Sequence, residues 1–353
     1  MSSHITGSGS YIPQKVATNE RFQKNAFYNE DGTKFGHEND VIIKKFKAIT
    51  GISERRYIQD NLVTSDIAFY AAEEAIADAQ IDKETIDYII VGHNYGDVKH
   101  GTQQSDTVPS LASRVKHLLR IKNPHCVAYD VLFGCPGWVE GIIQAHAYIQ
   151  AGMAKRCLII GAEALSRVVD QHDRDSMIYS DGAGAVILEK QDHNSSGIIT
   201  HKSASFTLDE AHFIYFGESN NQDTNDARRY IKMYGRKIYE FAITHVPQAL
   251  KDCLDESGIA IKDVKKIFIH QANEKMDQVI VERFYKLYGE EASEAVLPMT
   301  INKLGNSSVA TVPTVFDLVC KQKLKGHTVT KGDIVIFASV GAGMNINAIV
   351  YRM

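Results

Sequence analysis

One cysteine in this chain occupies a position that suits a nucleophile. Cys135 lies in VLFGCPGWVEG (131–141), directly before Pro136 and a mostly apolar stretch. Proline suits the first turn of a helix, because its missing N–H would be unpaired there anyway. The free N–H groups and the positive end of a helix dipole favour a thiolate, so the position predicts a thiol pKa below the usual value of about 8.5. It also leaves the Cys135 N–H available to an oxyanion. A small structural core cysteine is the alternative interpretation.

A cysteine nucleophile needs polar partners, and two residues qualify. His270 ends an apolar run in IFIHQAN (267–273), and Asn306 lies in a glycine turn in LGNSSVATVP (304–313). A packing histidine and a turn-forming asparagine are the alternatives. Both residues occupy turns that correspond, in an internal repeat, to the turns around Cys135, and this symmetry predicts that all three meet at one centre.

That repeat divides the chain into two similar halves. DAQIDKETIDYIIVG (78–92) and ESGIAIKDVKKIFIH (256–270) each indicate a helix end, a polar turn and a buried strand. A helix follows in each half, and then a strand-like run with a glycine turn, VAYDVLFG (127–134) and VLPMTINKLG (296–305). The pattern predicts a duplicated α/β architecture.

We therefore expect an N-terminal half at 1–190 that carries the cysteine and a C-terminal half at 191–353 that carries the histidine and the asparagine. Strands that are apolar on consecutive residues, such as DYIIVG (87–92), predict mixed sheets covered by helices on both faces. The stretch 137–151 is apolar around most of a helical circumference, so we expect a helix buried between the two sheets.

Composition excludes several classes of protein. The 353 residues are 44% hydrophobic, enough for a substantial core, and the net charge of −4 gives no general attraction to nucleic acid or anionic membranes. Five cysteines without a CxxC, and no HExxH, predict neither a disulfide framework nor a metal site. We find no apolar run near the roughly 18–20 residues of a membrane span and no signal-peptide pattern, so we expect a cytoplasmic protein.

Essentially the whole chain resembles the β-ketoacyl-acyl-carrier-protein synthase III group of the thiolase-like fold. The resemblance implies a layered αβαβα fold with two mixed five-stranded sheets around central buried helices, a homodimer, and no metal or other cofactor. The stretches that carry it are GSGSYIPQKVATNE (7–20), TGISERRYI (50–58), GCPGW, YSDGAGAVILE, IHQAN, LGNSSVATVP and GAGMNINAIVY.

The resemblance implies an acyltransferase with Cys135, His270 and Asn306 as catalytic residues. An acyl group from a coenzyme A or carrier-protein thioester would be held on Cys135 and condensed with a malonyl-type thioester on acyl carrier protein. His270 and Asn306 would hydrogen-bond the malonyl thioester carbonyl, and the N–H groups of Cys135 and Ala342 would form the oxyanion hole.

The chain also departs from the family pattern. Val340 replaces an aromatic residue, and the tryptophan expected before TGI to stack on the coenzyme A adenine is absent from VIIKKFKAITGI (41–52). Arg174 matches a family position near that ligand, and we expect Asn273 and Trp138 to contact substrate as well. The loop 25–40 is longer than expected, and we interpret 206–229 as a lid or tunnel segment.

A basic rim could dock an acidic carrier protein, although ordinary solvated side chains are the alternative. The candidates are Lys44, Lys45, Lys47, Arg228, Arg229, Lys232, Arg236, Lys237 and Lys275.

Initiation of fatty-acid synthesis is the leading function. A specialised enzyme that joins acyl or β-ketoacyl thioesters, as in alkylresorcinol or polyketide biosynthesis, is a close alternative. A non-catalytic acyl-binding protein of the same fold is less favoured, because Cys135, His270 and Asn306 are all present. A degradative thiolase would need a second cysteine in the C-terminal glycine turn, and GAGMNIN has none.

Overall fold

The first of two central sheets is built from the N-terminal part of the chain. The computed structural model describes residues 2–102, 104–191, 196–223 and 227–353. The sheet has the order β1-β7-β6-β4-β5, and β1 and β6 run antiparallel to β7 while β6, β4 and β5 are parallel. Its strands are β1 (Ser2–Tyr11), β4 (Tyr88–Gly92), β5 (Val127–Val131), β6 (Arg156–Ala164) and β7 (Asp181–Gln191).

The second sheet has the order β11-β12-β13-β8, with β11 and β12 parallel and the remaining pairs antiparallel. Its strands are β8 (Gly197–Ser205), β11 (Val264–Ile269), β12 (Ile334–Gly341) and β13 (Asn345–Arg352). Most residues of β11, β12 and β13 are buried, as expected for a sheet covered on both faces.

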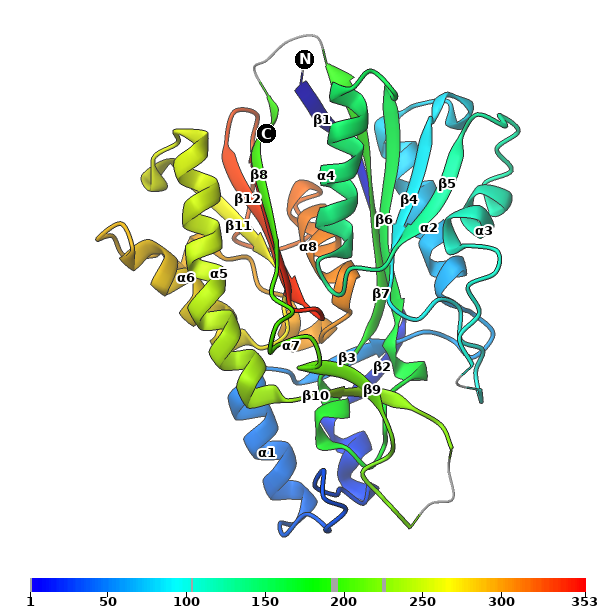
Figure 1. Ribbon diagram of the computed structural model, residues 1–353, viewed down its shortest axis with the longest axis vertical. Helices are drawn as coiled ribbons and strands as arrows, with labels where there is room; N and C mark the ends of the chain where they lie inside the picture. The colour runs from blue at the N-terminus through cyan, green and yellow to red at the C-terminus, as the bar shows by residue number, and fades with distance from the viewer. Residues whose placement is uncertain (1, 103, 192–195, 224–226) are drawn as a thin grey trace.

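Helices form three layers around the two sheets, which confirms the expected thiolase-like layered fold. In Figure 1, α4 (Gly137–Gln150) and α8 (Thr311–Cys320) lie between the sheets. The outer face of the first sheet is covered by α2 (Thr64–Ala79) and α3 (Leu111–Leu118), and that of the second by α5 (Gly235–Ser257) and α6 (Glu274–Lys286). Among the described residues, we find no helix with both the length and the apolar character needed to cross a membrane.

The second sheet has four strands among the described residues rather than the five that we expected. The strand-like run at 296–305 instead begins at the end of a 3-10 turn (Glu294–Val296) and contains the short helix α7 (Ile301–Leu304). Pro298 cannot donate to a strand ladder. The side chain of Gln271 donates to the Pro298 carbonyl at 2.8 Å and accepts from the Thr300 N–H at 2.9 Å, so it supplies bonds that a strand partner would otherwise make.

A smaller lobe extends beyond one end of the sheets, at the bottom of Figure 1. It contains α1 (Asn39–Thr50), the pair β2 (Lys15–Thr18) and β3 (Glu54–Tyr57), and the antiparallel pair β9 (Ile214–Gly217) and β10 (Tyr230–Met233). Of the last pair, β9 lies within the segment 206–229 that we interpreted as a lid or tunnel, and β10 begins directly after it. Residues 224–226 lie outside the described residues.

The first sheet packs tightly against the segment that follows Asn306. A Cβ atom on Gly161 of β6 would overlap the carbonyl oxygen of Val309 and lie 3.0 Å from Trp138 Cβ. We expect Gly161→Ala to lower the free energy of unfolding by about 1–3 kcal/mol through overpacking, as measured by urea denaturation. Gly182→Ala is the matched control, because its nearest neighbour, Ser307 Cβ, lies at 3.4 Å. Equal stability of the two variants would contradict this prediction.

Candidate active site

Cys135 lies in the turn that joins β5 to α4. Gly134 has φ +67°, which favours glycine, and Pro136 is the N-cap of α4, so Cys135 lies one residue outside the helix rather than within its first turn. A Cβ atom on Gly341 would lie 2.6 Å from the Cys135 nitrogen, and one on Gly134 would lie 2.7 Å from the Ala342 nitrogen. The two glycine turns therefore hold the cysteine and Ala342 in contact.

His270 directly follows β11 and is buried. Its Nδ1 lies 2.8 Å from Thr311 Oγ1, and the Thr311 hydroxyl donates to the Ser308 carbonyl at 2.9 Å. Because that hydroxyl uses its only proton on Ser308, Nδ1 of His270 must be the donor to Thr311. Burial lowers the pKa of His270 to about 4, so near neutral pH the ring is neutral and its Nε2 carries a lone pair.

Asn306 is fixed through its backbone and its side chain. Its N–H and carbonyl bond to Ile178 and Ser180 at 3.0 and 2.8 Å. Its Oδ1 accepts the N–H of Ser308 at 2.8 Å, so its Nδ2 remains as the donor toward a ligand. Asn306 therefore offers a hydrogen-bond donor to a ligand, whereas His270 offers a hydrogen-bond acceptor.

The Cys135 thiol is weakly acidic in this setting. Desolvation by burial raises its pKa to about 11, and the nearby Glu163 acts in the same direction, while a hydrogen bond of 3.2 Å from the Ser308 hydroxyl opposes them. The prediction of a lowered pKa was therefore wrong. The sequence showed the helix terminus but could not show how many distant segments close over the sulfur.

One cavity of about 200 Å³ brings the three predicted catalytic residues together. Cys135, His270 and Asn306 line it with the predicted residues Val340 and Ala342. Its remaining wall is mostly apolar or aromatic and comes from both halves and from the β9–β10 pair. That wall includes Tyr95, Leu165, Tyr179, Ile214, Tyr215, Phe216, Ile231, Met233 and Met344.

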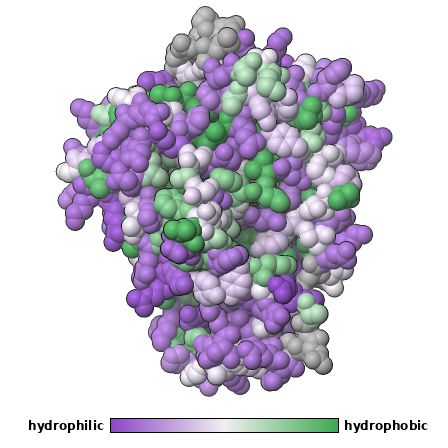
Figure 2. Space-filling view, viewed as in Figure 1, coloured by the Kyte–Doolittle hydropathy of each residue, from purple (hydrophilic) through white to green (hydrophobic). Residues whose placement is uncertain are grey.

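A second cavity of about 780 Å³ continues the first toward the surface, and both are lined by Asn306, Met233 and Met276. The predicted substrate residues Arg174 and Asn273 line this outer cavity. Arg174 lies 4.8 Å above the ring of Phe35, from the long loop 25–40. Figure 2 shows hydrophilic residues over most of the lower lobe and apolar residues gathered above it.

The predicted basic rim divides into three groups. Lys45, Arg236 and Lys237 line the outer cavity. Other members are exposed without lining it, namely Lys44, Lys47, Arg228, Arg229 and Lys275. Lys232 is buried and pairs with Asp170 and Asp173 at 2.6 and 3.1 Å, so its assignment to the rim was wrong.

Trp138 does not contact substrate space. Its side chain is fully buried, packs edge-on against Phe337 and lines neither cavity. The residue lies close to the nucleophile in sequence, separated from it by Pro136 and Gly137, but its side chain faces the core between the sheets. Our expectation of a substrate contact is corrected accordingly.

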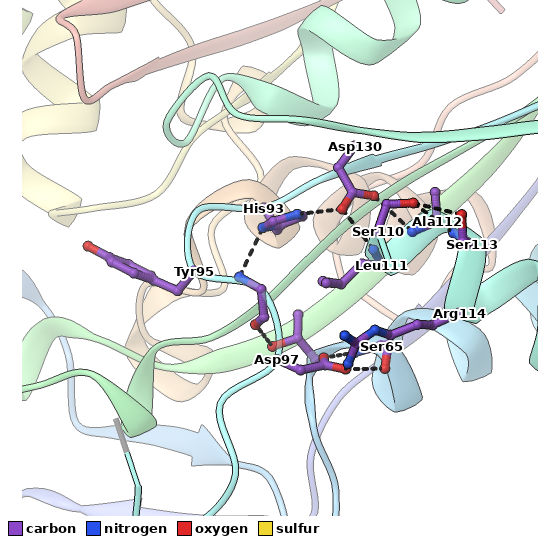
Figure 3. A network of polar contacts seen from close by, with 12 residues as sticks. Ser65, His93, Tyr95, Asp97, Ser110, Leu111, Ala112, Ser113, Arg114 and Asp130 are labelled. Carbon is purple, nitrogen blue, oxygen red and sulfur yellow. Dashed lines mark hydrogen bonds and ion pairs between the residues drawn. The ribbon is translucent and has the colours of Figure 1, made fainter. Parts of the chain in front are cut away.

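A loop after β4, which we did not predict as part of the site, contributes Asn94 and Tyr95 to the inner cavity. Figure 3 shows the hydrogen bonds that hold this loop in position. His93 Nδ1 accepts the Gly96 N–H at 3.0 Å. The proton of the neutral ring therefore lies on Nε2, which donates to Asp130 at 3.0 Å. Asp130 in turn accepts two N–H groups at the start of α3, while Tyr95 points away from the network. No simple spacing in the sequence links these residues.

In the part of the chain that the structure describes, no group of three or more His, Cys, Asp or Glu side chains is placed to hold a metal ion. The arrangement offers a thiol, an acceptor nitrogen, an amide donor and closely packed backbone N–H groups. This set suits acyl transfer through a covalent thioester.

The fold and the site define a thiolase-like condensing enzyme, and comparisons agree. The family model described as 3-oxoacyl-[acyl-carrier-protein] synthase III matches residues 129–205, and its C-terminal counterpart matches 254–353. A β-ketoacyl-[acyl-carrier-protein] synthase III of Vibrio parahaemolyticus is 32% identical over 97% of both chains.

Solved structures give the same result. A 3-oxoacyl-[acyl-carrier-protein] synthase III from Aquifex aeolicus is 25% identical, with a TM-score of 0.81 over 99% of this chain and 100% of that one. OleA from Xanthomonas campestris is 18% identical with a TM-score of 0.78 over 100% of this chain and 97% of that one, which shows a shared fold alone. The chain belongs to the β-ketoacyl-acyl-carrier-protein synthase III family and is a condensing acyltransferase.

The raised thiol pKa predicts how Cys135 reacts with iodoacetamide. Because the thiolate fraction rises about tenfold per pH unit below the pKa, we expect the alkylation rate to rise close to tenfold per unit from pH 7 to 9. Peptide mass spectrometry follows Cys135 separately from the other cysteines, and Cys135→Ser is the control. A rate that levels off below pH 8 would show a lowered pKa and contradict this assignment.

Proposed function

We propose that the enzyme condenses an acyl thioester with a malonyl-type thioester on acyl carrier protein, releasing carbon dioxide and forming a β-ketoacyl product, as in the initiation of fatty-acid synthesis. The observation that carries the proposal is the convergence of Cys135, His270 and Asn306 on one inner cavity with an outer cavity leading to it. These steps require no metal or other cofactor, and we place them in the cytoplasm.

In the first half-reaction, Cys135 takes the acyl group. The neutral His270 ring offers a lone pair at Nε2, which accepts the thiol proton as the sulfur attacks the acyl carbonyl. The developing oxyanion is stabilised by the N–H groups of Cys135 and Ala342. The departing thiolate of the donor takes the proton from His270, and an acyl-cysteine remains.

In the second half-reaction, the malonyl thioester carbonyl accepts a hydrogen bond from Asn306 Nδ2. This bond stabilises the enolate that forms when carbon dioxide leaves. The enolate carbon attacks the acyl-cysteine, the carbon–sulfur bond breaks, and the Cys135 thiolate takes up one proton from solvent. His270 can donate to the same carbonyl only while its Nε2 is protonated, since its Nδ1 proton is directed at Thr311.

The outer cavity suits the arm that carries the thioester. Arg174 and Phe35 both line this cavity and lie in cation–π contact. Lys45, Arg236 and Lys237 lie on the same cavity and would face the acidic surface of a carrier protein.

The wall formed by β9 and β10 favours one alternative. Tyr215, Phe216 and Met233 give the inner cavity an apolar and aromatic surface, and Phe216 packs on Tyr95 with ring centroids 5.2 Å apart. Such a wall would also suit a longer or aromatic donor in a specialised pathway, such as alkylresorcinol or polyketide synthesis. Comparing acyl donors on one enzyme preparation separates the two functions.

The first prediction from the proposed function separates the two half-reactions. We expect Asn306→Ala to retain acylation of Cys135 within a few-fold but to lose condensation by about 10²–10³, because the amide donor serves the enolate. Single-turnover acylation and product formation are measured on the same variant, so the first serves as the control for folding. Equal losses in both half-reactions would contradict the assigned role.

The second prediction concerns the rim. We expect the triple variant K45E/R236E/K237E to lower kcat/KM for the carrier-protein thioester at least about tenfold at low salt, with a smaller difference at high salt. The matched control K323E/K325E/K331E reverses three exposed charges that line neither cavity. If both variants behave alike, the rim does not dock the carrier.

The third prediction concerns assembly. β5 is an edge strand of the first sheet, and the exposed side chains Val127 and Leu132 lie at or beside it. We propose that two copies pair along this edge to form a homodimer. Val127→Glu with Leu132→Glu should shift the mass from dimer to monomer in light scattering. Leu287→Glu, at an exposed site that follows α6 on the outer face of the second sheet, should not. A monomeric wild type would refute the dimer.

A further inference from the structure

A buried acid beside the nucleophile has no part in the two half-reactions described above. Glu163 lies near the end of β6 and its side chain is fully buried. Its Oε2 accepts the backbone N–H of Asn94 at 2.9 Å and the Asn94 Nδ2 at 2.6 Å. Its Oε1 is buried without a hydrogen-bond partner among the described residues.

A chain of hydrogen bonds leads from this acid to the reactive sulfur. Asn94 Nδ2 donates one hydrogen to Glu163 and the other to Ser308 Oγ, at 3.0 Å. Ser308 Oγ therefore acts as an acceptor on that side, and its own proton is donated to Cys135 Sγ at 3.2 Å. Ser308 has φ +53°, an uncommon conformation for a residue with a side chain, and its N–H bonds to Asn306.

Packing alone does not explain a carboxyl group at this position. A glutamine of the same shape could accept both bonds from Asn94 without the cost of burying a charge. Burial raises the pKa of Glu163 to about 7, so the group changes charge close to neutral pH. The titratable groups that face it are His93 and Tyr95 from the loop after β4 and Cys135 from the turn before α4.

The direction of every bond in the chain depends on the acceptor that Glu163 presents to Asn94. Its Oε2 accepts from the Asn94 backbone N–H and from Nδ2, so it fixes the NH₂ group of Asn94 toward itself and toward Ser308. Without that acceptor, the amide can turn its oxygen toward Ser308. In that arrangement the Ser308 proton goes to Asn94, and the sulfur loses its donor.

We propose that Glu163 is a positioning residue for the nucleophile, acting through the Asn94 amide to hold the Ser308 hydroxyl proton on Cys135 Sγ. The inference rests on the proposed role of Cys135, but it concerns the thiol itself. It can therefore be tested without an acyl donor.

The test is a double-mutant cycle on Cys135 alkylation by iodoacetamide, with wild type, Glu163→Leu, Ser308→Ala and the double variant at pH 8.5. Glu163→Leu removes the acceptor for Asn94 and a negative charge. The loss of charge alone favours the thiolate and is measured in the Ser308→Ala background. With Ser308 present, the loss of its directed proton opposes that gain. We expect the effect of Glu163→Leu to be at least about threefold smaller, or reversed, when Ser308 is present.

Equal effects in both backgrounds would show that Glu163 acts by charge alone and would overturn the proposal, as would no effect in either. Asp181→Asn is the matched control, because Asp181 is another buried carboxyl group whose partners are Ser166 and Ile58. We expect it to give the same factor in both backgrounds.

The inference and the proposed function fail separately. Failure to form an acyl-cysteine would refute the proposed function and leave the result of this cycle standing.

Discussion

The close approach of two glycine turns is the constraint on which the rest of the site depends. Gly134 precedes the nucleophile and Gly341 ends β12, and neither position has room for a Cβ atom. The contact joins the first sheet to the second at the point where α4 begins. It places the thiol, the predicted oxyanion donors, His270 after β11 and Asn306 after α7 within one small cavity.

Burial then determines the chemistry of that cavity. Desolvation raises the pKa of Cys135 and lowers that of His270, because it penalises both a thiolate and an imidazolium. Both side chains are therefore held in their neutral forms. The resting site therefore holds no fixed ion pair. A proton can move from sulfur to nitrogen when a thioester arrives, while Asn306 keeps a donor ready because Ser308 holds its oxygen.

Sequence reasoning predicted the layered fold and the meeting of Cys135, His270 and Asn306, because the internal repeat relates turns that are far apart in the chain. It failed where the result depends on surroundings rather than on pattern. The thiol pKa depends on desolvation by several segments, the side chain of Trp138 points to the core side of α4, and Gln271 replaces strand bonds near Pro298. The role of Glu163 could not be predicted, because an acidic residue near the end of an apolar strand indicates no function until its neighbours in the fold are known.

Intact-protein mass spectrometry after incubation with a panel of acyl-coenzyme A and acyl-carrier-protein thioesters tests the central claim most directly. The account predicts that at least one donor adds its acyl mass to the wild type and not to Cys135→Ala, and that malonyl carrier protein then removes the added mass. If no donor labels Cys135, the covalent mechanism is wrong and the chain must be treated as an acyl-binding member of its fold.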